Sequence, residues 1–169
     1  MKNLASHKPF NQNIILHRFN KSDLVNLNNI TPKLSGIECD VQITKDNNIV
    51  VYHDKKLNDN YIGNLTLEEI HETQPSIKDL KTHIELIKNR VTSLAIKNFQ
   101  YHIELKGNQS GDQCKNYAYH INKIIDELKI PTNNLYILAF NNNILIELEK
   151  FNDPTKKFKS CLVIQKKHD

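Results

Sequence analysis

Short apolar runs alternate along the chain with segments in which apolar residues recur at helical spacing. Each run has the length and the branched or aromatic content of a β-strand. The six runs cover residues 14–16, 36–43, 49–52, 101–105, 135–140 and 161–164. The segments between them predict helices within residues 66–71, 76–94, 114–128 and 144–151. Strands that alternate with helices favour an α/β fold built on a parallel sheet or barrel.

Local signals add detail to this pattern. Thr66 and Glu69 form a capping box that opens the first helix, and Ser76 with Asp79 resembles the same start for the second. Residues 46–48, Asp-Asn-Asn, lie between the second and third strands. Their side chains favour a turn and tolerate a left-handed backbone.

The composition fits one globular domain over residues 1–169. Apolar residues make up 38% of the chain and charged residues 25%, which excludes collagen-like, low-complexity and wholly disordered chains. No apolar run approaches the roughly 20 residues that a membrane helix needs, and residues 1–13 lack the pattern of a secretory signal. The three cysteines, Cys39, Cys114 and Cys161, lie far apart and predict free thiols in a reducing cytoplasm.

The net charge of +4 is mild, and much of the excess lies near the end of the chain. The lysines there are Lys156, Lys157, Lys159, Lys166 and Lys167. We interpret them as a solvated surface and a frayed end. The alternative is an arm that binds nucleic acid, but such an arm needs arginines, and the chain has only Arg18 and Arg90. We therefore expect no nucleic-acid partner.

Polar side chains follow several of the predicted strands. His17 and Arg18 come directly after the first strand. His53 and Asp54 come after the third, and Lys106 comes after the fourth. In a parallel α/β sheet the carboxyl ends of the strands converge on one rim, where active sites form. We therefore expect these side chains to share one rim.

Three carboxylates interrupt the same strands. Glu38 and Asp40 are two residues apart, so both project from one face of the second strand, and Glu104 lies in the fourth. Inward carboxylates repel one another and lose solvation unless a cation lies among them. Oxygen ligands suit a hard divalent ion, so the pattern predicts one Mg²⁺ or Ca²⁺.

The other polar residues would complete a site for phosphate chemistry. His17 and His53 can supply a general acid and a general base near neutral pH. Arg18 and Lys106 add fixed positive charge, which suits an anionic substrate. The combination predicts metal-assisted cleavage of a phosphate ester.

A structural role is the alternative for each of these residues taken alone. A single histidine at a strand end is more often structural, and each carboxylate could lie on an exposed strand face. Their joint placement at strand ends and on strand faces favours a site. We interpret the remaining histidines as surface or packing residues; they are His7, His71, His83, His102, His120 and His168.

Short motifs stand in a fixed order along the chain. HR lies within residues 15–18, E-x-D-V-x-x-T-x-D within 36–46 and HD within 50–54. Leu-Thr-Leu-Glu-Glu-Ile follows at 65–70, and Ile-Glu-Leu-Lys at 103–106. Together they resemble the signatures of the glycerophosphodiester phosphodiesterases.

This resemblance implies a TIM barrel that hydrolyses glycerophosphodiesters, which are small-molecule substrates, to glycerol 3-phosphate and an alcohol. The implied mechanism is attack of the neighbouring glycerol hydroxyl on phosphorus, after which water opens the cyclic intermediate. Its acid–base pair would be His17 and His53. The implied metal ligands are Glu38, Asp40 and Glu104, and the implied phosphate-binding residues are Arg18 and Lys106.

Two features depart from the family pattern. Phe19 and Asn20 stand where the family usually has glycine and then a Pro-Glu-Asn-Thr-like stretch. Because Phe lacks the backbone freedom of glycine, we expect the rim beside His17 to differ. The short first loop is similar to that of sphingomyelinase D-type phospholipases, although residues 44–46 and 53–54 favour the hydrolase.

The second departure is length, because a complete (β/α)₈ barrel runs to about 250 residues. With six strands predicted, we expect an incomplete or shortened TIM barrel. The possibilities are a C-terminally truncated domain, a compact variant, or a barrel closed by a second copy in a homo-oligomer. The alternative function is a catalytically degenerate homologue that binds an anion or a protein without turnover.

Overall fold

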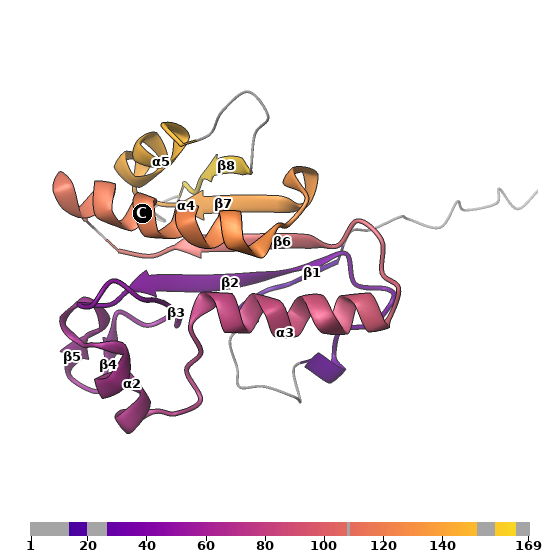
Figure 1. The fold of residues 1–169 in the computed structure, drawn as a ribbon, viewed down its shortest axis with the longest axis horizontal. Helices are drawn as coiled ribbons and strands as arrows, with labels where there is room; N and C mark the ends of the chain where they lie inside the picture. Colours follow the sequence, from indigo (N-terminus) through magenta and orange to yellow (C-terminus); the bar gives the residue numbers. More distant parts are fainter. Residues whose placement is uncertain (1–13, 20–26, 108, 152–157, 165–169) are drawn as a thin grey trace, which may run out of the picture.

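A computed structural model of the chain describes residues 14–19, 27–107, 109–151 and 158–164. A six-stranded sheet is crossed on one face by helices, and a small hairpin lies at one end (Figure 1). The sheet strands are β1 (Ile15–Leu16), β2 (Gly36–Ile43), β3 (Ile49–Val51), β6 (Gln100–Leu105), β7 (Leu135–Ala139) and β8 (Lys159–Leu162). The hairpin strands are β4 (Lys56–Leu57) and β5 (Asn60–Tyr61), and the 3₁₀ turns are η1 (Ile62–Asn64) and η2 (Thr132–Asn134). The α-helices are α2 (Leu67–Thr73), α3 (Leu80–Ser93), α4 (Asp112–Leu128) and α5 (Asn142–Glu149).

The sheet is mostly parallel and follows the order β1-β2-β6-β7-β8. Across its centre, Asp40 of β2 stands level with Glu104 of β6, which stands level with Leu138 of β7. All six predicted strands are present, so the predicted α/β architecture is confirmed. Among the described residues no ladder joins β8 back to β1, so the barrel is open, as the incomplete barrel predicted from the sequence requires.

The direction of β3 differs from the prediction. It pairs antiparallel with the second half of β2, from Val41 opposite Val51 to Ile43 opposite Ile49. The connection is too short for the crossover that parallel strands need, so the two strands form a hairpin. Asn47 in the turn has a left-handed φ of 66°, as its sequence predicts.

The two faces of the central strands have different chemistry, because alternate side chains point to opposite sides. Ile37, Cys39 and Ile103 are at most 1% exposed and belong to the main core, with the apolar stripes of α3 and α4. Burial of each such isoleucine stabilises the fold by about 1.5–3 kcal/mol relative to exposure. The opposite face of β2 and β6 carries the acidic residues. The helices therefore pack on one face of the sheet, and the acidic residues lie on the opposite face.

Helix starts follow the predicted caps with one exception. Thr66 accepts from the Glu69 backbone N–H, and the Glu69 carboxylate accepts from the Thr66 backbone N–H at 2.7 Å, which confirms the capping box. Helix α3 begins after Asp79, whose side chain caps it. Ser76 does not cap α3, because the following segment is extended and Lys78 O accepts a hydrogen bond from β3.

Candidate active site

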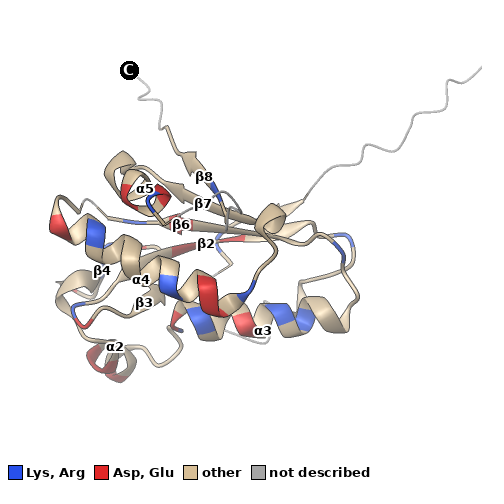
Figure 2. Ribbon diagram, turned by 45° about the horizontal axis from the view of Figure 1, so that its top comes forward, with Lys and Arg blue, Asp and Glu red and all other residues tan. Residues whose placement is uncertain are grey.

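The structure brings three carboxylates together on the polar face of the sheet. Glu38 and Asp40 come from β2, and Glu104 comes from the neighbouring strand β6. One oxygen atom from each side chain lies within 4.8 Å of the other two. The three residues are 7%, 1% and 9% exposed, respectively. Figure 2 shows acidic segments in the middle of the sheet, apart from the charged residues along the helices.

Burial leaves this acidic cluster, Glu38, Asp40 and Glu104, poorly solvated. Within the described part of the chain, Glu38 Oε1 and Asp40 Oδ2 accept no hydrogen bond. Burial raises the pKa of Glu38 above its usual range, and the Asp40 and Glu104 carboxylates raise it further. The Arg18 backbone N–H, which donates to Glu38 Oε2 at 2.8 Å, lowers this pKa, as does the nearby His17. The cluster therefore requires additional positive charge.

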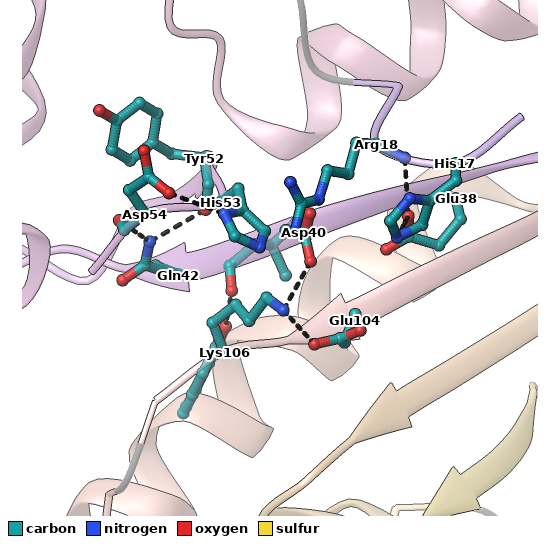
Figure 3. A network of polar contacts seen from close by, with 12 residues as sticks. His17, Arg18, Glu38, Asp40, Gln42, Tyr52, His53, Asp54, Glu104 and Lys106 are labelled. Atoms are coloured by element: carbon teal, nitrogen blue, oxygen red, sulfur yellow. Dashed lines mark hydrogen bonds and ion pairs between the residues drawn. The ribbon is translucent and has the colours of Figure 1, made fainter. Parts of the chain in front are cut away.

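Lys106 supplies part of that charge. Its Nζ lies 2.9 Å from Asp40 Oδ1 and also contacts Glu104 Oε1 (Figure 3). Burial lowers the pKa of Lys106, but the hydrogen bonds to the two acids outweigh burial, so the pKa is raised overall. The Lys106 backbone N–H donates to Val41 O at 2.9 Å, which anchors the lysine beside β2. Lys106, which the sequence predicts to bind phosphate, therefore contacts the acids in this structure.

The acidic cluster could hold a metal ion. Carboxylate oxygens are the ligands that hard divalent cations such as Mg²⁺ and Ca²⁺ prefer. The Glu38 Oε1 and Asp40 Oδ2 atoms identified above have lone pairs available for coordination. Lys106 carries one positive charge against three carboxylates. The residues present therefore fit a divalent cation.

His17 and Arg18 lie on one side of the acidic cluster, directly after β1 (Figure 3). His17 Nε2 is 3.4 Å from Glu38 Oε2, and the His17 side chain is 68% exposed. Arg18 has a left-handed φ of 52°, which turns its backbone N–H toward Glu38. Figure 3 shows the Arg18 guanidinium pointing toward the Asp40 side of the site.

Phe19 does not need the backbone freedom of the glycine that it replaces. The left-handed conformation belongs to Arg18, and Phe19 is not among the described residues with positive φ. The Phe19 side chain is 3% exposed in the main core, with its ring centroid 6.0 Å from that of His83. Its backbone N–H donates to Glu38 O at 2.7 Å. Phe19 therefore anchors the loop that carries His17.

His53 lies on the other side of the acidic cluster (Figure 3). The sequence predicts that it reaches the site at the carboxyl end of a parallel strand. That part of the prediction is wrong, because β3 is antiparallel to β2. Since β3 ends level with Val41 and the Tyr52 backbone N–H donates to Asp40 O at 3.0 Å, the next residue reaches the acids. His53 Nδ1 is 2.7 Å from Asp54 Oδ1. A carboxylate only accepts hydrogen bonds, so this contact favours a proton on Nδ1 and leaves Nε2 as the acceptor.

Gln42 is a buried polar residue of the site that the sequence motifs do not mark as chemically active. It continues the two-residue spacing of Glu38 and Asp40 on the same face of β2, and it is 7% exposed. This spacing is the sequence signal that could have found it. Gln42 Nε2 donates to Tyr52 O at 2.9 Å and to Asp54 O at 2.7 Å.

The threonine and aspartate of the T-x-D motif have structural contacts. Thr44 Oγ1 donates to Asp46 Oδ1 at 2.6 Å, and the Leu67 backbone N–H donates to both Asp46 oxygens at 3.1 and 3.3 Å. Burial raises the pKa of Asp46, but hydrogen bonds from Thr44, Asn48 and Leu67 outweigh burial and lower it overall. These contacts hold the β2–β3 turn against the start of α2.

Other histidines have contacts typical of packing residues. The His102 ring stacks on Tyr136 with a centroid separation of 4.4 Å, and burial lowers the pKa of His102. His71 Nε2 is 2.9 Å from Ile77 O. Of the C-terminal lysines, Lys159 lies in β8. Two of the remaining histidines and four of the C-terminal lysines lie outside the described part of the chain: His7, His168, Lys156, Lys157, Lys166 and Lys167.

No helix in the described ranges is long and apolar enough to cross a bilayer.

Several solved structures share this fold. A glycerophosphodiester phosphodiesterase from Parabacteroides distasonis is 21% identical, with a TM-score of 0.70 over 89% of this chain and 65% of its own. A glycerophosphodiester phosphodiesterase from Thermotoga maritima is 23% identical, with a TM-score of 0.61 over 88% of this chain and 62% of its own. An Oleispira antarctica phosphodiesterase, solved with the product sn-glycerol-3-phosphate, is 19% identical, with a TM-score of 0.63 over 82% of this chain and 62% of its own.

The chain thus spans less than two thirds of the length of these solved structures. No curated protein sequence matches it. The family model described as the glycerophosphoryl diester phosphodiesterase family matches residues 30–160, which include the acidic cluster, His53 and Lys106. With most of its length covered by that match, the chain belongs to the glycerophosphoryl diester phosphodiesterase family.

Proposed function

We propose that the protein is a metal-dependent phosphodiesterase that hydrolyses glycerophosphodiesters to glycerol 3-phosphate and an alcohol. The observation that carries this proposal is the acidic cluster, whose oxygens lie within 4.8 Å of one another between His17 and His53. Family membership supports it. The Oleispira antarctica phosphodiesterase, which shares the fold, was solved with the product sn-glycerol-3-phosphate.

Each charged group has a proposed partner in the substrate complex. The acidic cluster would hold one Mg²⁺ or Ca²⁺, which when bound neutralises charge on the phosphate oxygens. Arg18 and Lys106 would bind the same phosphate. Because Lys106 now contacts Asp40 and Glu104, its flexible side chain must turn from the acids to the phosphate.

The two histidines would divide the proton transfers. As the glycerol hydroxyl oxygen next to the phosphate bonds to phosphorus, His53 Nε2 accepts its proton, consistent with the Asp54 contact at Nδ1. The bond from phosphorus to the alcohol breaks, and His17 donates a proton to the departing oxygen. His17 then takes a proton from the water that attacks the cyclic phosphodiester. His53 returns its proton to the glycerol oxygen as the ring opens.

Release of glycerol 3-phosphate from glycerophosphocholine, with Mg²⁺ or Ca²⁺ and with a chelator, tests this proposal. We expect His17→Ala and His53→Ala each to lower the rate by about 10²-fold or more, as removal of a general acid or base does. His120→Ala, on α4, is the matched control and should retain the wild-type rate. Wild-type rates in both site variants would contradict the mechanism.

The open sheet favours a second candidate function. A degenerate homologue would bind an anion or a partner protein through the same charged residues without turnover, because β1 and β8 do not close the barrel in the described part of the chain. Binding of glycerol 3-phosphate by folded, cation-loaded protein that hydrolyses no glycerophosphodiester would support this candidate. Cation-stimulated hydrolysis would eliminate it.

The setting of the protein is also part of the proposal. The domain would extend over residues 1–169 and work in the cytoplasm. The wide spacing of its three cysteines along the chain, with no CxxC pair, supports a reducing compartment.

A further inference from the structure

Gln42 connects the strand that carries two of the acids to the loop that carries His53 (Figure 3). We propose that Gln42 is a positioning residue that holds His53 beside the acidic cluster. The proposal deepens the function proposed above and rests on the role given there to His53.

The loop that carries His53 lies beyond the end of β3, so the strand pairing does not fix its conformation. The ladder between β2 and β3 ends at Val41 and Val51. The His53 side chain is 31% exposed, and Asp54, which contacts its ring, is 73% exposed. A contact to so exposed a carboxylate restrains the imidazole only weakly. The position of His53 must therefore depend on its backbone.

Gln42 holds that backbone on both sides of His53. The single Nε2 atom donates to Tyr52 O at 2.9 Å and to Asp54 O at 2.7 Å, the carbonyls before and after the histidine. Both partners are carbonyl oxygens, which only accept, so the NH₂ of the side-chain amide, and not its oxygen, must face the loop. Gln42 is 7% exposed, so water has little access to replace these hydrogen bonds.

The chemistry of this position suits glutamine. A glutamate would set a carboxylate against two carbonyl oxygens, and an apolar side chain would leave both carbonyls without this donor. Gln42 projects from the same face of β2 as Asp40, so its contacts tie His53 to the strand that carries the proposed cation ligands. Displacement of a catalytic group by about 1 Å costs about 10²-fold in rate.

Two variants remove the donors but keep the length of the side chain. We expect Gln42→Met and Gln42→Glu to lower kcat by about 10²-fold, with less than about a threefold change in KM. Ca²⁺ affinity in Gln42→Met, measured by calorimetry, should stay within about threefold of wild type because the acids are untouched. Gln100→Met is the matched control, since Gln100 is a half-buried glutamine of β6 whose Oε1 lies 3.1 Å from His102 Nε2.

Nuclear magnetic resonance provides a readout that does not depend on activity. In the wild type, the Gln42 side-chain amide protons should exchange slowly and show correlations across hydrogen bonds to the Tyr52 and Asp54 carbonyl carbons. In Gln42→Met, the backbone order parameters of residues 52–54 should fall, whereas Gln100→Met should leave them unchanged.

Three results would overturn the role of Gln42. These are rapid exchange of its amide protons in the wild type, unchanged order and kcat in Gln42→Met, and loss of Ca²⁺ affinity in parallel with kcat. The first measurement uses the wild type, so it decides the matter even where a variant fails to fold. An absence of glycerophosphodiester hydrolysis by the wild type would instead contradict the proposed function.

Discussion

Lys106 Nζ lies 2.9 Å from Asp40 Oδ1, within the buried acidic cluster. The same ammonium contacts Glu104, so one positive charge balances part of the repulsion among three carboxylates. At about 4 Å, two unit charges near a protein surface interact by roughly 4 kcal/mol. A divalent cation on these oxygens would compete with the lysine. Lys106 therefore acts as a counter-ion of the acidic cluster.

Replacement of this lysine separates its two effects. We predict that Lys106→Met lowers the free energy of unfolding of the cation-free protein by about 1–3 kcal/mol, because charged hydrogen bonds are lost. The same change should raise Ca²⁺ affinity by about tenfold, because the competing ammonium is removed. Chelator-treated urea unfolding and calorimetry measure the two quantities. Lys55→Met, at an exposed lysine, is the control, and weaker Ca²⁺ binding in Lys106→Met would contradict the counter-ion role.

The raised pKa of Glu38 predicts a pH dependence of definite sign. The folded protein binds a proton at Glu38 at pH values where the unfolded chain, with a pKa near 4.5, has released it. The contribution of Glu38 to stability is therefore lost as pH rises from 4.5 through the raised pKa. Ca²⁺ displaces that proton, so its affinity should rise over the same pH range.

Glu38→Gln isolates this contribution. The difference in the free energy of unfolding between wild type and variant, measured with a chelator, should shift against the wild type as pH rises through this range. The rise of Ca²⁺ affinity with pH should also become shallower in the variant. A difference that is independent of pH would show that Glu38 titrates alike in the folded and unfolded chains.

Asp46 provides a structural test that leaves the proposed cation site intact. We predict that Asp46→Ala lowers the free energy of unfolding by about 1 kcal/mol, because the Leu67 backbone N–H loses its acceptor at the start of α2. The pKa of Asp46 is lower in the folded protein than in the unfolded chain. The stability lost in Asp46→Ala is therefore full at pH values above the pKa of the unfolded chain, and it fades as pH falls through the pKa of the folded protein.

Urea unfolding at several pH values measures this loss, and Asp59→Ala, at an exposed aspartate, is the control. Ca²⁺ affinity should stay within about twofold of wild type. A large drop in Ca²⁺ affinity at unchanged stability would place Asp46 in the cation site instead.

The edge strand β8 predicts self-association. All of its residues are exposed, Leu162 is 49% exposed, and the following Ile164 is 83% exposed. In the described part of the chain no strand pairs with the outer edge of β8, and an open edge with apolar side chains is a surface that other strands pair with. We predict a homo-oligomer by light scattering that Leu162→Lys converts to monomer and that Leu86→Lys, at an exposed leucine of α3, does not. A wild type that is monomeric at every concentration would contradict this interface.

Much of the central sheet follows from local pattern. The run at β2 is long and apolar on one face, and its two-residue spacing places Glu38 and Asp40 on the other face without reference to distant residues. The capping box at Thr66 is equally local. Such features depend on a few neighbours along the chain, so the sequence predicts them.

Features set by distant contacts were not predictable in this way. The direction of β3 depends on pairing with β2, and the approach of His53 to the site depends on a hairpin rather than on a parallel strand. The β4–β5 hairpin was missed because its strands have two residues each and only Leu57 is buried. The pairing of Lys106 with Asp40 joins the residue after β6 to β2, so no local spacing reveals it.

The central claim is that Glu38, Asp40 and Glu104 bind one divalent cation. Diffraction from crystals grown with Ca²⁺, recorded at a wavelength where calcium scatters anomalously, tests it most directly. We predict one anomalous peak with oxygens of all three side chains at about 2.3–2.6 Å, and no such peak in Asp40→Asn. A wild-type site that stays without calcium at saturating concentration, with Lys106 still on Asp40, would contradict the claim.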